Sequence, residues 1–244
     1  MPGADSLSSM DSMKVTDLPD RSQDYLKKIF DLVDWDRGDV STASGVALSD
    51  LAEALGQQRS TASEAVKRLA GMGLIDHTPY KPIMLTEQGR ELAVQLVRRH
   101  RLVETFLERV VGYGVEEIHA EAEVLEHAVS DLFIERIDEA LGHPTRDPHG
   151  DPIPCSDGTV ETVDSVPLSA LEEGEPAIVV RLRDRDAKLL RYLTDCGVAP
   201  GVGVRLLPAP YDGMARIAVD GRDEAVTLAA DALGHIQVRR EPAE

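Results

Sequence analysis

Histidine and glutamate side chains recur at helical spacing in the middle of the 244-residue chain. They are His100, Glu104, His119, Glu123, Glu126 and His127. Because residues three and four apart share one face of a helix, two neighbouring helical segments would each carry imidazole and carboxylate groups on one side. Residues 110–135 contain no Lys or Arg, so cations nearby in the sequence cannot pair with these carboxylates. A bound divalent cation would relieve the repulsion between them, whereas the alternative is a solvated acidic helix face with incidental histidines.

The composition of the chain limits the classes of protein to which it can belong. A hydrophobic fraction of 42% is sufficient for real cores, and an aromatic fraction of 4% makes those cores mainly aliphatic. No apolar run is long enough to span a membrane and no signal-peptide pattern is present, so no membrane partner is expected. Cys155 and Cys196 lie in no CxxC pattern, which favours a cytoplasmic protein with free thiols. A net charge of −18 argues against indiscriminate nucleic-acid binding but leaves room for a local DNA-binding surface.

The elements before the histidines are expected to form a separate DNA-reading unit. Residues 1–20 are rich in Ser, Asp and Gly and are expected to be a mobile arm. A helix starts near residue 21, and Asp24 close to its start suits the helix dipole even without a functional role. Residues 36–45 are expected to be a loop.

Two further helices and a short hairpin complete the pattern of this unit. Ser49 is expected to cap the second helix, and Ser60 or Thr61 the third, after a short turn. Two short strands around a proline-containing turn follow in residues 74–86, and Thr86 caps the next helix. Helix, turn, helix and hairpin in this order are typical of a winged helix-turn-helix over residues 21–99.

The third helix would enter the major groove of DNA with its N-terminal end toward the base edges. Side chains that could read bases there are Gln58, Arg59, Ser60, Thr61, Ser63 and Glu64, and those that suit phosphates are Lys67, Arg68 and Lys81. Residues 21–99 hold as many basic as acidic residues, so the acidity of the chain lies elsewhere. The alternative is a winged helix that binds proteins rather than DNA.

Two more units are expected after the winged helix. Residues 100–154 offer more apolar helical surface than a lone winged helix needs, which indicates a helical dimer interface. Residues 155–169 are expected to be a polar linker. Short alternating runs separated by Gly, Pro and Asp turns, with one short helix at residues 187–196, predict a small β-barrel over residues 170–240.

The runs HRLVETFLERV, EEIHAEAEVLEHAVSD and GHPTRDPHGDPIP, together with QDYLKKIF and the winged helix, resemble the diphtheria-toxin-repressor family of metal-dependent transcriptional repressors. The resemblance covers roughly residues 15–240. It implies a mainly α fold with a small β domain: an N-terminal winged helix-turn-helix, a helical metal-binding and dimerisation domain, and a C-terminal SH3-like (FeoA-like) barrel. It implies a DNA-release metal site formed by Asp24, Glu123, Glu126 and His127. It also implies an ancillary site formed by His100, Glu104 and His119 and completed by an acid near the short helix, where Asp186 aligns best and Asp184 competes.

The resemblance also bears on the metal. Iron-responsive members of the family carry cysteine at the position of Glu123 and methionine at that of Asp24, whereas the carboxylates here resemble the manganese regulators. Oxygen ligands suit hard Mn²⁺. Lys27 stands where compact manganese regulators carry a second acid, so a two-ion cluster of their kind is not expected. Zn²⁺, Co²⁺ or Cd²⁺ are also expected to bind.

These patterns and the family resemblance together predict a homodimeric, manganese-dependent repressor that binds double-stranded operator DNA and controls metal-uptake and homeostasis genes, with no small organic substrate. The alternatives are an iron(II)-dependent repressor, a metal-dependent hydrolase, and an adaptor without metal. A hydrolase would leave the winged helix unexplained, and the sequence contains no nucleophile motif. The switch is expected to depend on Asp24: without metal, Glu123 and Glu126 would repel it, and with metal it would become a shared ligand.

Overall fold

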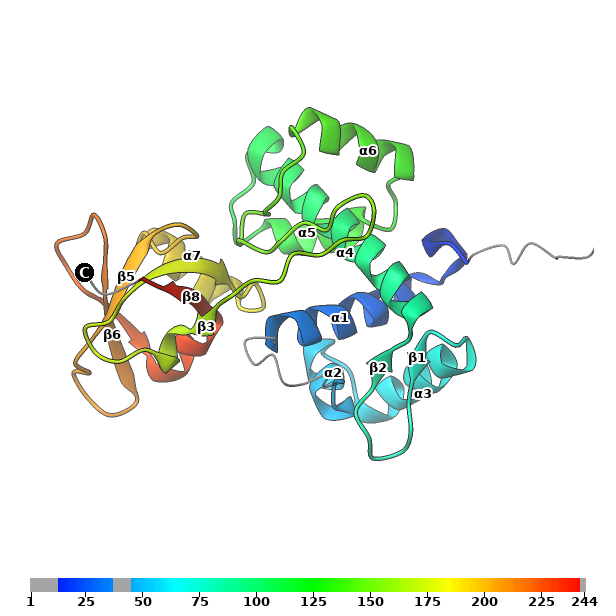
Figure 1. Cartoon of the computed structure of the whole chain (residues 1–244), viewed down its shortest axis with the longest axis horizontal. Helices are drawn as coiled ribbons and strands as arrows, with labels where there is room; N and C mark the ends of the chain where they lie inside the picture. Colours follow the sequence, from blue (N-terminus) through cyan, green and yellow to red (C-terminus); the bar gives the residue numbers. More distant parts are fainter. Residues whose placement is uncertain (1–12, 37–44, 242–244) are drawn as a thin grey trace, which may run out of the picture.

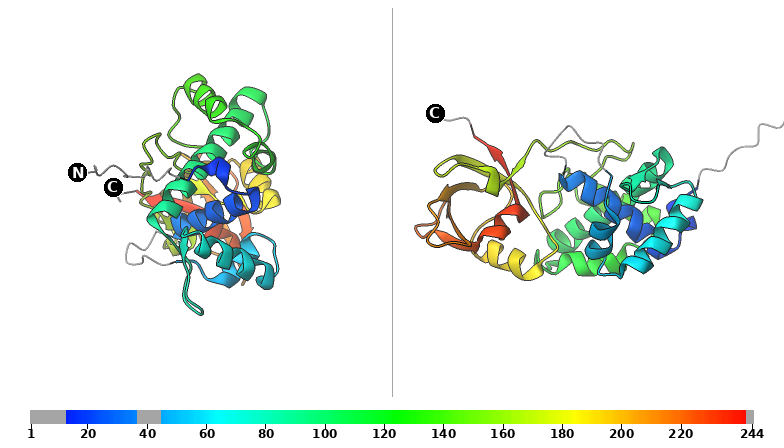
Figure 2. Two further views of the ribbon diagram at one scale, coloured as in Figure 1. Left: turned by 90° about the vertical axis from the view of Figure 1, so that its right-hand side faces the viewer. Right: turned by 90° about the horizontal axis from the view of Figure 1, so that it is seen from below.

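The computed structural model describes residues 13–36 and 45–241 of the chain. We refer to residues 13–86 as the winged-helix unit, 87–154 as the helical unit and 155–241 as the β unit. Figure 1 shows the β unit beside the two helical parts, and the view from below in Figure 2 shows the same side-by-side arrangement along the long axis. The expected arm at residues 1–12 and most of the expected loop at 36–45 lie outside the described residues.

The winged-helix unit contains the predicted helix-turn-helix and hairpin. Its elements are α1 (Asp20–Asp36), α2 (Leu48–Ala54), α3 (Arg59–Gly71), β1 (Ile75–Asp76) and β2 (Met84–Leu85), and the two strands pair antiparallel. The predicted caps of α2 and α3 are wrong, because the extended residues Ala47 and Gln58 precede these helices. Ser49, Ser60 and Thr61 therefore lie in first turns, where Ser60 and Thr61 are exposed to solvent.

The arm prediction is wrong for residues 13–20. A 3-10 helix, η1 (Val15–Asp17), precedes α1, and the side chains of Val15 and Leu18 are only 6% and 3% exposed. Both pack into the aliphatic core of the winged-helix unit, and Gln23 Nε2 donates a hydrogen bond of 2.8 Å to the Leu18 carbonyl. Burial of these two side chains favours an ordered segment despite its polar composition.

One long helix, α4 (Glu87–Phe106), connects the winged-helix and helical units (Figure 1). Thr86 caps it as predicted, because its hydroxyl accepts a hydrogen bond from Gly89 N. The predicted boundary between residues 99 and 100 lies inside this helix, so the two units share a rigid element. His100 and Glu104 are carried on its second half.

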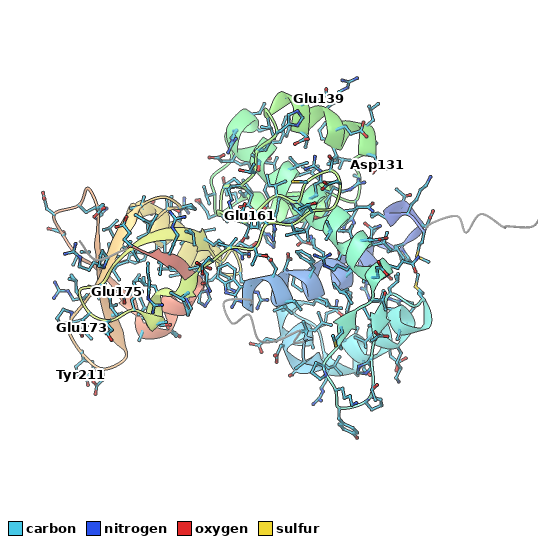
Figure 3. All side chains as sticks on the ribbon, viewed as in Figure 1. Asp131, Glu139, Glu161, Glu173, Glu175 and Tyr211 are labelled. Carbon is cyan, nitrogen blue, oxygen red and sulfur yellow. The ribbon has the colours of Figure 1, made fainter. Side chains whose placement is uncertain are left out.

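The helical unit continues after a break at Gly112. A π-helical turn, η2 (Leu107–Val111), ends at Gly112, which has a φ of 86°. The helices α5 (Ile118–Leu125) and α6 (Asp131–Ala140) follow and pack on α4. Figure 3 labels Asp131 and Glu139 near the two ends of α6, and Asp131 pairs with Arg99 of α4.

The β unit is a six-stranded antiparallel sheet in the order β3-β8-β4-β5-β6-β7. Its elements are β3 (Val166–Pro167), η3 (Leu168–Ala170), β4 (Pro176–Leu182), α7 (Ala187–Asp195), β5 (Gly203–Leu207), β6 (Met214–Val219), β7 (Val226–Ala229), η4 (Ala230–His235) and β8 (Ile236–Arg240). The strands enclose an aliphatic core, as the low aromatic content predicts. Strand β3 begins inside the expected linker. Figure 3 places Glu173, Glu175 and Tyr211 at the end of this unit that faces away from the helices.

Over residues 13–36 and 45–241, no helix combines the length and apolar composition that crossing a membrane requires.

Candidate metal centre and DNA-binding surface

Helix α1 meets the turn after α5 through a group of potential metal ligands. Asp24 Oδ1 lies 2.9 Å from His127 Nε2, and this nitrogen lies 3.5 Å from Glu126 Oε1. Each of the three residues offers a ligand atom within 4.8 Å of the others. Burial, and to a smaller extent Glu123, raises the pKa of Asp24 against the opposing effects of His127 and Lys27. One nitrogen and two oxygen donors in this geometry can bind a divalent cation that joins the winged-helix unit to the helical unit.

The carboxylates of α5 are not without a counter-ion, contrary to the expectation from residues 110–135. Lys27 of α1 is 1% exposed, and its Nζ lies 2.9 Å from Glu123 Oε1 and 2.5 Å from Glu126 Oε1. Burial lowers the pKa of Lys27, but Glu126 and Glu123 outweigh burial and raise it above its usual range. Electrostatic repulsion therefore does not separate the two units, because a buried ammonium group from one neutralises the acids of the other.

A second group of potential ligands links α4, α5 and the β unit. His100 Nε2 lies 2.9 Å from Glu104 Oε1, and His119 Nδ1 lies 3.2 Å from the same oxygen. Asp184 Oδ2, in the loop between β4 and α7, lies 2.9 Å from His119 Nδ1. The four ligand atoms lie within 4.8 Å of one another. Two imidazoles and two carboxylates form a mixed nitrogen and oxygen set that suits a first-row divalent ion.

The structure brings Asp184, and not Asp186, to this second group, so the preferred alignment of Asp186 is wrong. Asp186 is the N-cap of α7 and accepts hydrogen bonds of 3.0 Å from Lys188 N and Leu189 N. Its carboxylate is exposed and faces its own helix, whereas that of Asp184 is turned toward His119. Capping satisfies two backbone donors at the start of α7 and therefore holds Asp186 away from the cluster.

The acids of the second group favour protonation of its histidines in the absence of metal. Burial lowers the pKa of His119, but Asp184 and Glu104 outweigh it and raise the pKa to about 11. Burial and Lys27 oppose protonation of His100, yet Glu104 and Glu126 raise its pKa to about 9. Since a histidine ligand must give up its proton, a cation would displace these protons when it binds.

His100 connects the two groups. Its Nε2 faces Glu104, and its Nδ1 lies 2.5 Å from Glu126 Oε2. Burial raises the pKa of Glu126, but His100 and Lys27 outweigh burial and lower it to about 2. His100, Glu123 and Glu126 thus form a further group of mutually close ligand atoms, so the predicted residues Asp24, Glu123, Glu126 and His127 divide into two groups that share Glu126.

The loop that carries Asp184 is fixed to the rest of the chain by Arg181 of β4. The Arg181 guanidinium is 4% exposed, lies 2.9 Å from Asp34 Oδ2 of α1, and also pairs with Asp151 of the helical unit. The same guanidinium lies 4.9 Å from the ring centroid of Trp35, and that of Arg183 lies 4.7 Å from it. The β unit therefore contacts the C-terminal end of α1 close to the second ligand group.

The predicted DNA-binding residues lie on one exposed surface. The predicted residues on α3 and directly before it are exposed, except for Ser63, which is half-buried, and Lys81 is exposed on the wing. Arg59, Ser63, Lys67 and Lys81 line a groove of about 440 Å³ between α3 and the wing. Glu64 pairs with Lys67 at 2.8 Å, and this hydrogen bond lowers the pKa of Glu64.

Some residues at these surfaces were not predicted from the sequence. Tyr80 is fully exposed in the wing, where it has a φ of 67°, and it lines the groove with His77 and Ser49. An aromatic residue between Pro79 and Lys81 in a predicted wing is the signal that could have identified it.

Asp147 and His149 form another buried ligand group with Glu104, and both lie in the quoted run GHPTRDPHGDPIP.

A winged helix joined to helices lined with histidine and carboxylate groups and to a small β-barrel defines a metal-dependent DNA-binding regulator. Three family models match the chain in succession: the N-terminal DNA binding domain of iron dependent repressors at residues 17–83, their metal binding and dimerisation domain at 86–155, and the FeoA domain at 166–240. The chain belongs to the diphtheria-toxin-repressor family of metal-dependent transcriptional repressors, which are DNA-binding proteins and not enzymes.

Individual proteins show the same similarity. The iron-dependent repressor IdeR of Mycobacterium tuberculosis is 33% identical over 243 residues, which cover 93% of this chain and 100% of the relative. The transcriptional regulator MntR of Escherichia coli is 39% identical over 108 residues, 44% of this chain and 64% of that protein. A solved manganese-dependent transcriptional repressor in complex with manganese is 43% identical, with a TM-score of 0.81 and coverage of 90% of this chain and 100% of that one.

Proposed function

We propose that this chain is a homodimeric, manganese-responsive repressor that binds operator DNA in the cytoplasm and controls genes of metal uptake and homeostasis. The observation that carries the proposal is the composition of the ligand groups that join the units. They consist of imidazole and carboxylate groups without sulfur in the part of the chain that the structure describes. Carboxylate-rich sets suit Mn²⁺, whereas thiolate and thioether ligands suit softer ions.

An iron(II)-responsive repressor is the second candidate, and the name of the full-length mycobacterial relative favours it. A mobility-shift assay on the DNA upstream of the chain's own gene, with Mn²⁺, Fe²⁺ or Zn²⁺ added, distinguishes the two. Mn²⁺ should activate DNA binding at concentrations where Fe²⁺ has no advantage. Zn²⁺ should bind tightly, because the affinity of such ligands for first-row divalent ions generally follows the Irving–Williams order. It should nevertheless activate DNA binding poorly. Replacing Glu123 with Cys and Asp24 with Met should shift activation toward iron.

The proposed switch acts on the position of α1 relative to the helical unit. Lys27 already links α1 to Glu123 and Glu126, so the metal adds a second link through Asp24 and His127. In a dimer this link would fix two recognition helices at a spacing that matches half-sites about 34–36 Å apart, or a multiple of that. Moving a 1:99 equilibrium to 99:1 requires about 5.5 kcal/mol of differential metal binding.

Dimerisation is supported by exposed apolar side chains on the helical unit. Those of Val110, Val111, Val124, Leu132 and Phe133 are 59%, 52%, 69%, 61% and 39% exposed. Large apolar side chains that gather on one unit mark surfaces that associate with another chain. Sedimentation of the metal-free and Mn²⁺-loaded chain tests this part of the proposal.

The decisive experiment is Asp24→Ala, with Asp20→Ala as the matched control. Asp20 is exposed at the first position of the same helix, so its removal changes the charge of α1 without touching His127. Asp24→Ala should still dimerise and still bind metal through His100, Glu104, His119 and Asp184, but it should fail to retain DNA when Mn²⁺ is added. Normal manganese dependence in Asp24→Ala would overturn the proposed link and place the switch in the dimer interface.

A further inference from the structure

Gln23 and Asp24 are neighbours on α1 and contact the two nitrogens of one imidazole ring. Asp24 Oδ1 lies 2.9 Å from His127 Nε2, and Gln23 Oε1 lies 3.1 Å from His127 Nδ1. The proposed metal ion would bind on the Nε2 side, together with Asp24 and Glu126. The contact through Gln23 is not used in the proposed switch, although it holds the ring that carries a ligand atom.

The orientation of the Gln23 amide follows from its other hydrogen bond. Gln23 Nε2 donates to the carbonyl oxygen of Leu18 at 2.8 Å. A carbonyl oxygen can only accept a hydrogen bond, so the amide nitrogen, and not the amide oxygen, must face Leu18. The amide oxygen Oε1 therefore faces His127.

The position of hydrogen on His127 follows in turn. Because Gln23 Oε1 can only accept, Nδ1 of His127 carries hydrogen and donates it. In a neutral ring the lone pair then lies on Nε2, the nitrogen that is 2.9 Å from Asp24 Oδ1 and 3.5 Å from Glu126 Oε1. Histidines that bind metal generally donate their other ring nitrogen to an acceptor in this way, which fixes both the tautomer and the orientation of the ring.

The acceptor is held in place before any ion binds. Gln23 is 6% exposed, and Leu18, which anchors its amide, is 3% exposed in the core of the winged-helix unit. The backbone nitrogen of Gln23 also donates to the Pro19 carbonyl at 3.2 Å. Water has little access to an amide buried to this extent, and a buried polar group that loses its partner costs about 1–3 kcal/mol.

The two hydrogen bonds of Gln23 allow two roles, and each role requires a different part of the side chain. Anchoring Leu18 requires the donor, whereas orienting His127 requires the acceptor. Glutamate at this position would keep the acceptor and lose the donor. Methionine has a similar length and would lose both, so the two substitutions separate the roles.

We propose that Gln23 is a positioning residue for the metal centre, because it holds the Nδ1 hydrogen of His127 and thereby directs Nε2 at the ion shared with Asp24 and Glu126. The inference rests on the proposed metal binding by that group. Helix α1 then contributes twice to the centre: Asp24 supplies a ligand atom, and Gln23 orients a ligand that belongs to the turn after α5.

The first test compares Mn²⁺ affinities of full-length chains by electron paramagnetic resonance of the free ion. The binding component that Asp24→Ala removes identifies the group of Asp24, Glu126 and His127. For this component, Gln23→Met should weaken binding about tenfold to a hundredfold, the usual loss when the partner of a metal-bound histidine is removed. Gln23→Glu should bind at least as tightly as the unaltered chain, because a carboxylate is a stronger acceptor than an amide.

Tyr25→Phe is the matched control. It removes a hydrogen bond of 2.6 Å from the same helix to Gln57 and should leave the Mn²⁺ affinity unchanged. Unchanged affinity in Gln23→Met would overturn the inference. So would an equal loss in Gln23→Glu and Gln23→Met, since it would show that Gln23 acts by anchoring Leu18. If Asp24→Ala removes no component, the proposed metal site itself fails, so the two proposals can be told apart.

A second measurement covers the case in which Gln23→Met does not fold. The chain is prepared with isotopically labelled histidine rings and loaded with Zn²⁺, which is diamagnetic, and the signals of His127 are identified by their loss in His127→Gln. Magnetic resonance should show hydrogen on Nδ1 and metal on Nε2. Gln23→Glu should move the Nδ1 hydrogen to lower field, because the hydrogen bond becomes charge-assisted. Metal on Nδ1, or an Nδ1 hydrogen that does not respond to Gln23→Glu, would overturn the inference.

Discussion

Lys27→Met should destabilise the metal-free protein, because the substitution removes the buried cation that joins α1 to α5. Removing one partner of a buried ion pair costs about 3–5 kcal/mol. The lower figure applies here. Glu123 is 31% exposed, so water can solvate its carboxylate when Lys27 is removed. Glu126 is 1% exposed but retains its contact with His100 Nδ1 at 2.5 Å. A loss of about 3 kcal/mol lowers the urea midpoint by about 1 M for a denaturant slope of about 3 kcal/mol per M.

The assay is urea unfolding followed through Trp35, which is the single tryptophan of the chain and lies on α1. Lys67→Met is the matched control, because Lys67 also pairs with a glutamate, at 2.8 Å, but both side chains are largely exposed. That variant should change the free energy of unfolding by less than about 1 kcal/mol. Equal effects of the two substitutions would refute the assignment of Lys27 as a buried counter-ion.

Saturating Mn²⁺ should reduce the deficit of Lys27→Met, because a cation bound by Asp24, Glu126 and His127 supplies positive charge to the same carboxylate. A ligand that binds the folded state alone stabilises it according to its concentration relative to Kd. Lys27→Met should therefore gain more stability from Mn²⁺ than the unaltered chain does. An identical gain in both would show that the ion does not reach Glu126.

Three further outcomes are expected. Arg181→Leu should cost about 3 kcal/mol and shift the Trp35 emission, because it removes the buried guanidinium that pairs with Asp34 and Asp151 and leaves Asp34 with the more distant Arg101, at 3.7 Å; an unchanged spectrum would show that this contact does not hold α1. Burial lowers the pKa of His119 but Asp184 and Glu104 raise it to about 11, so the metal-free residue is protonated at neutral pH and Mn²⁺ must displace the proton. Calorimetry should therefore show affinity at that site rising about tenfold per pH unit for each proton displaced throughout the range below that pKa of about 11, and a flat profile around neutral pH would contradict this. Arg59→Ala should weaken operator binding and lower the slope of log affinity against log salt by about one, whereas Glu64→Gln should alter base preference and leave that slope unchanged.

Local patterns in the sequence determined much of the fold. Apolar residues at positions three and four apart predicted the helices, and alternation between turns predicted the β-barrel, because these periods follow from backbone geometry. Spacing also placed His100 with Glu104 on α4 and His119 with Glu123 on α5. The positions of Asp24, Glu123, Glu126 and His127 near one another came from the family resemblance, since spacing alone cannot bring α1 to α5.

Other features were decided only by tertiary structure. Lys27 lies 96 residues before Glu123, and nothing in the charge of residues 110–135 reveals that α1 delivers its ammonium group to them. Val15 and Leu18 lie in a polar segment, and their order depends on a core to which many distant residues contribute.

The choice between Asp184 and Asp186 shows the physical reason most directly. The two carboxylates lie two residues apart at the start of α7, and the sequence offers both to the ligand group. Backbone donors of α7 engage Asp186, while pairing of Arg181 with Asp34 and Asp151 holds the preceding strand so that Asp184 meets His119. Short-range periodicity determines which face of an element a side chain occupies, but contacts between distant elements decide which of two neighbouring carboxylates reaches the metal ligands.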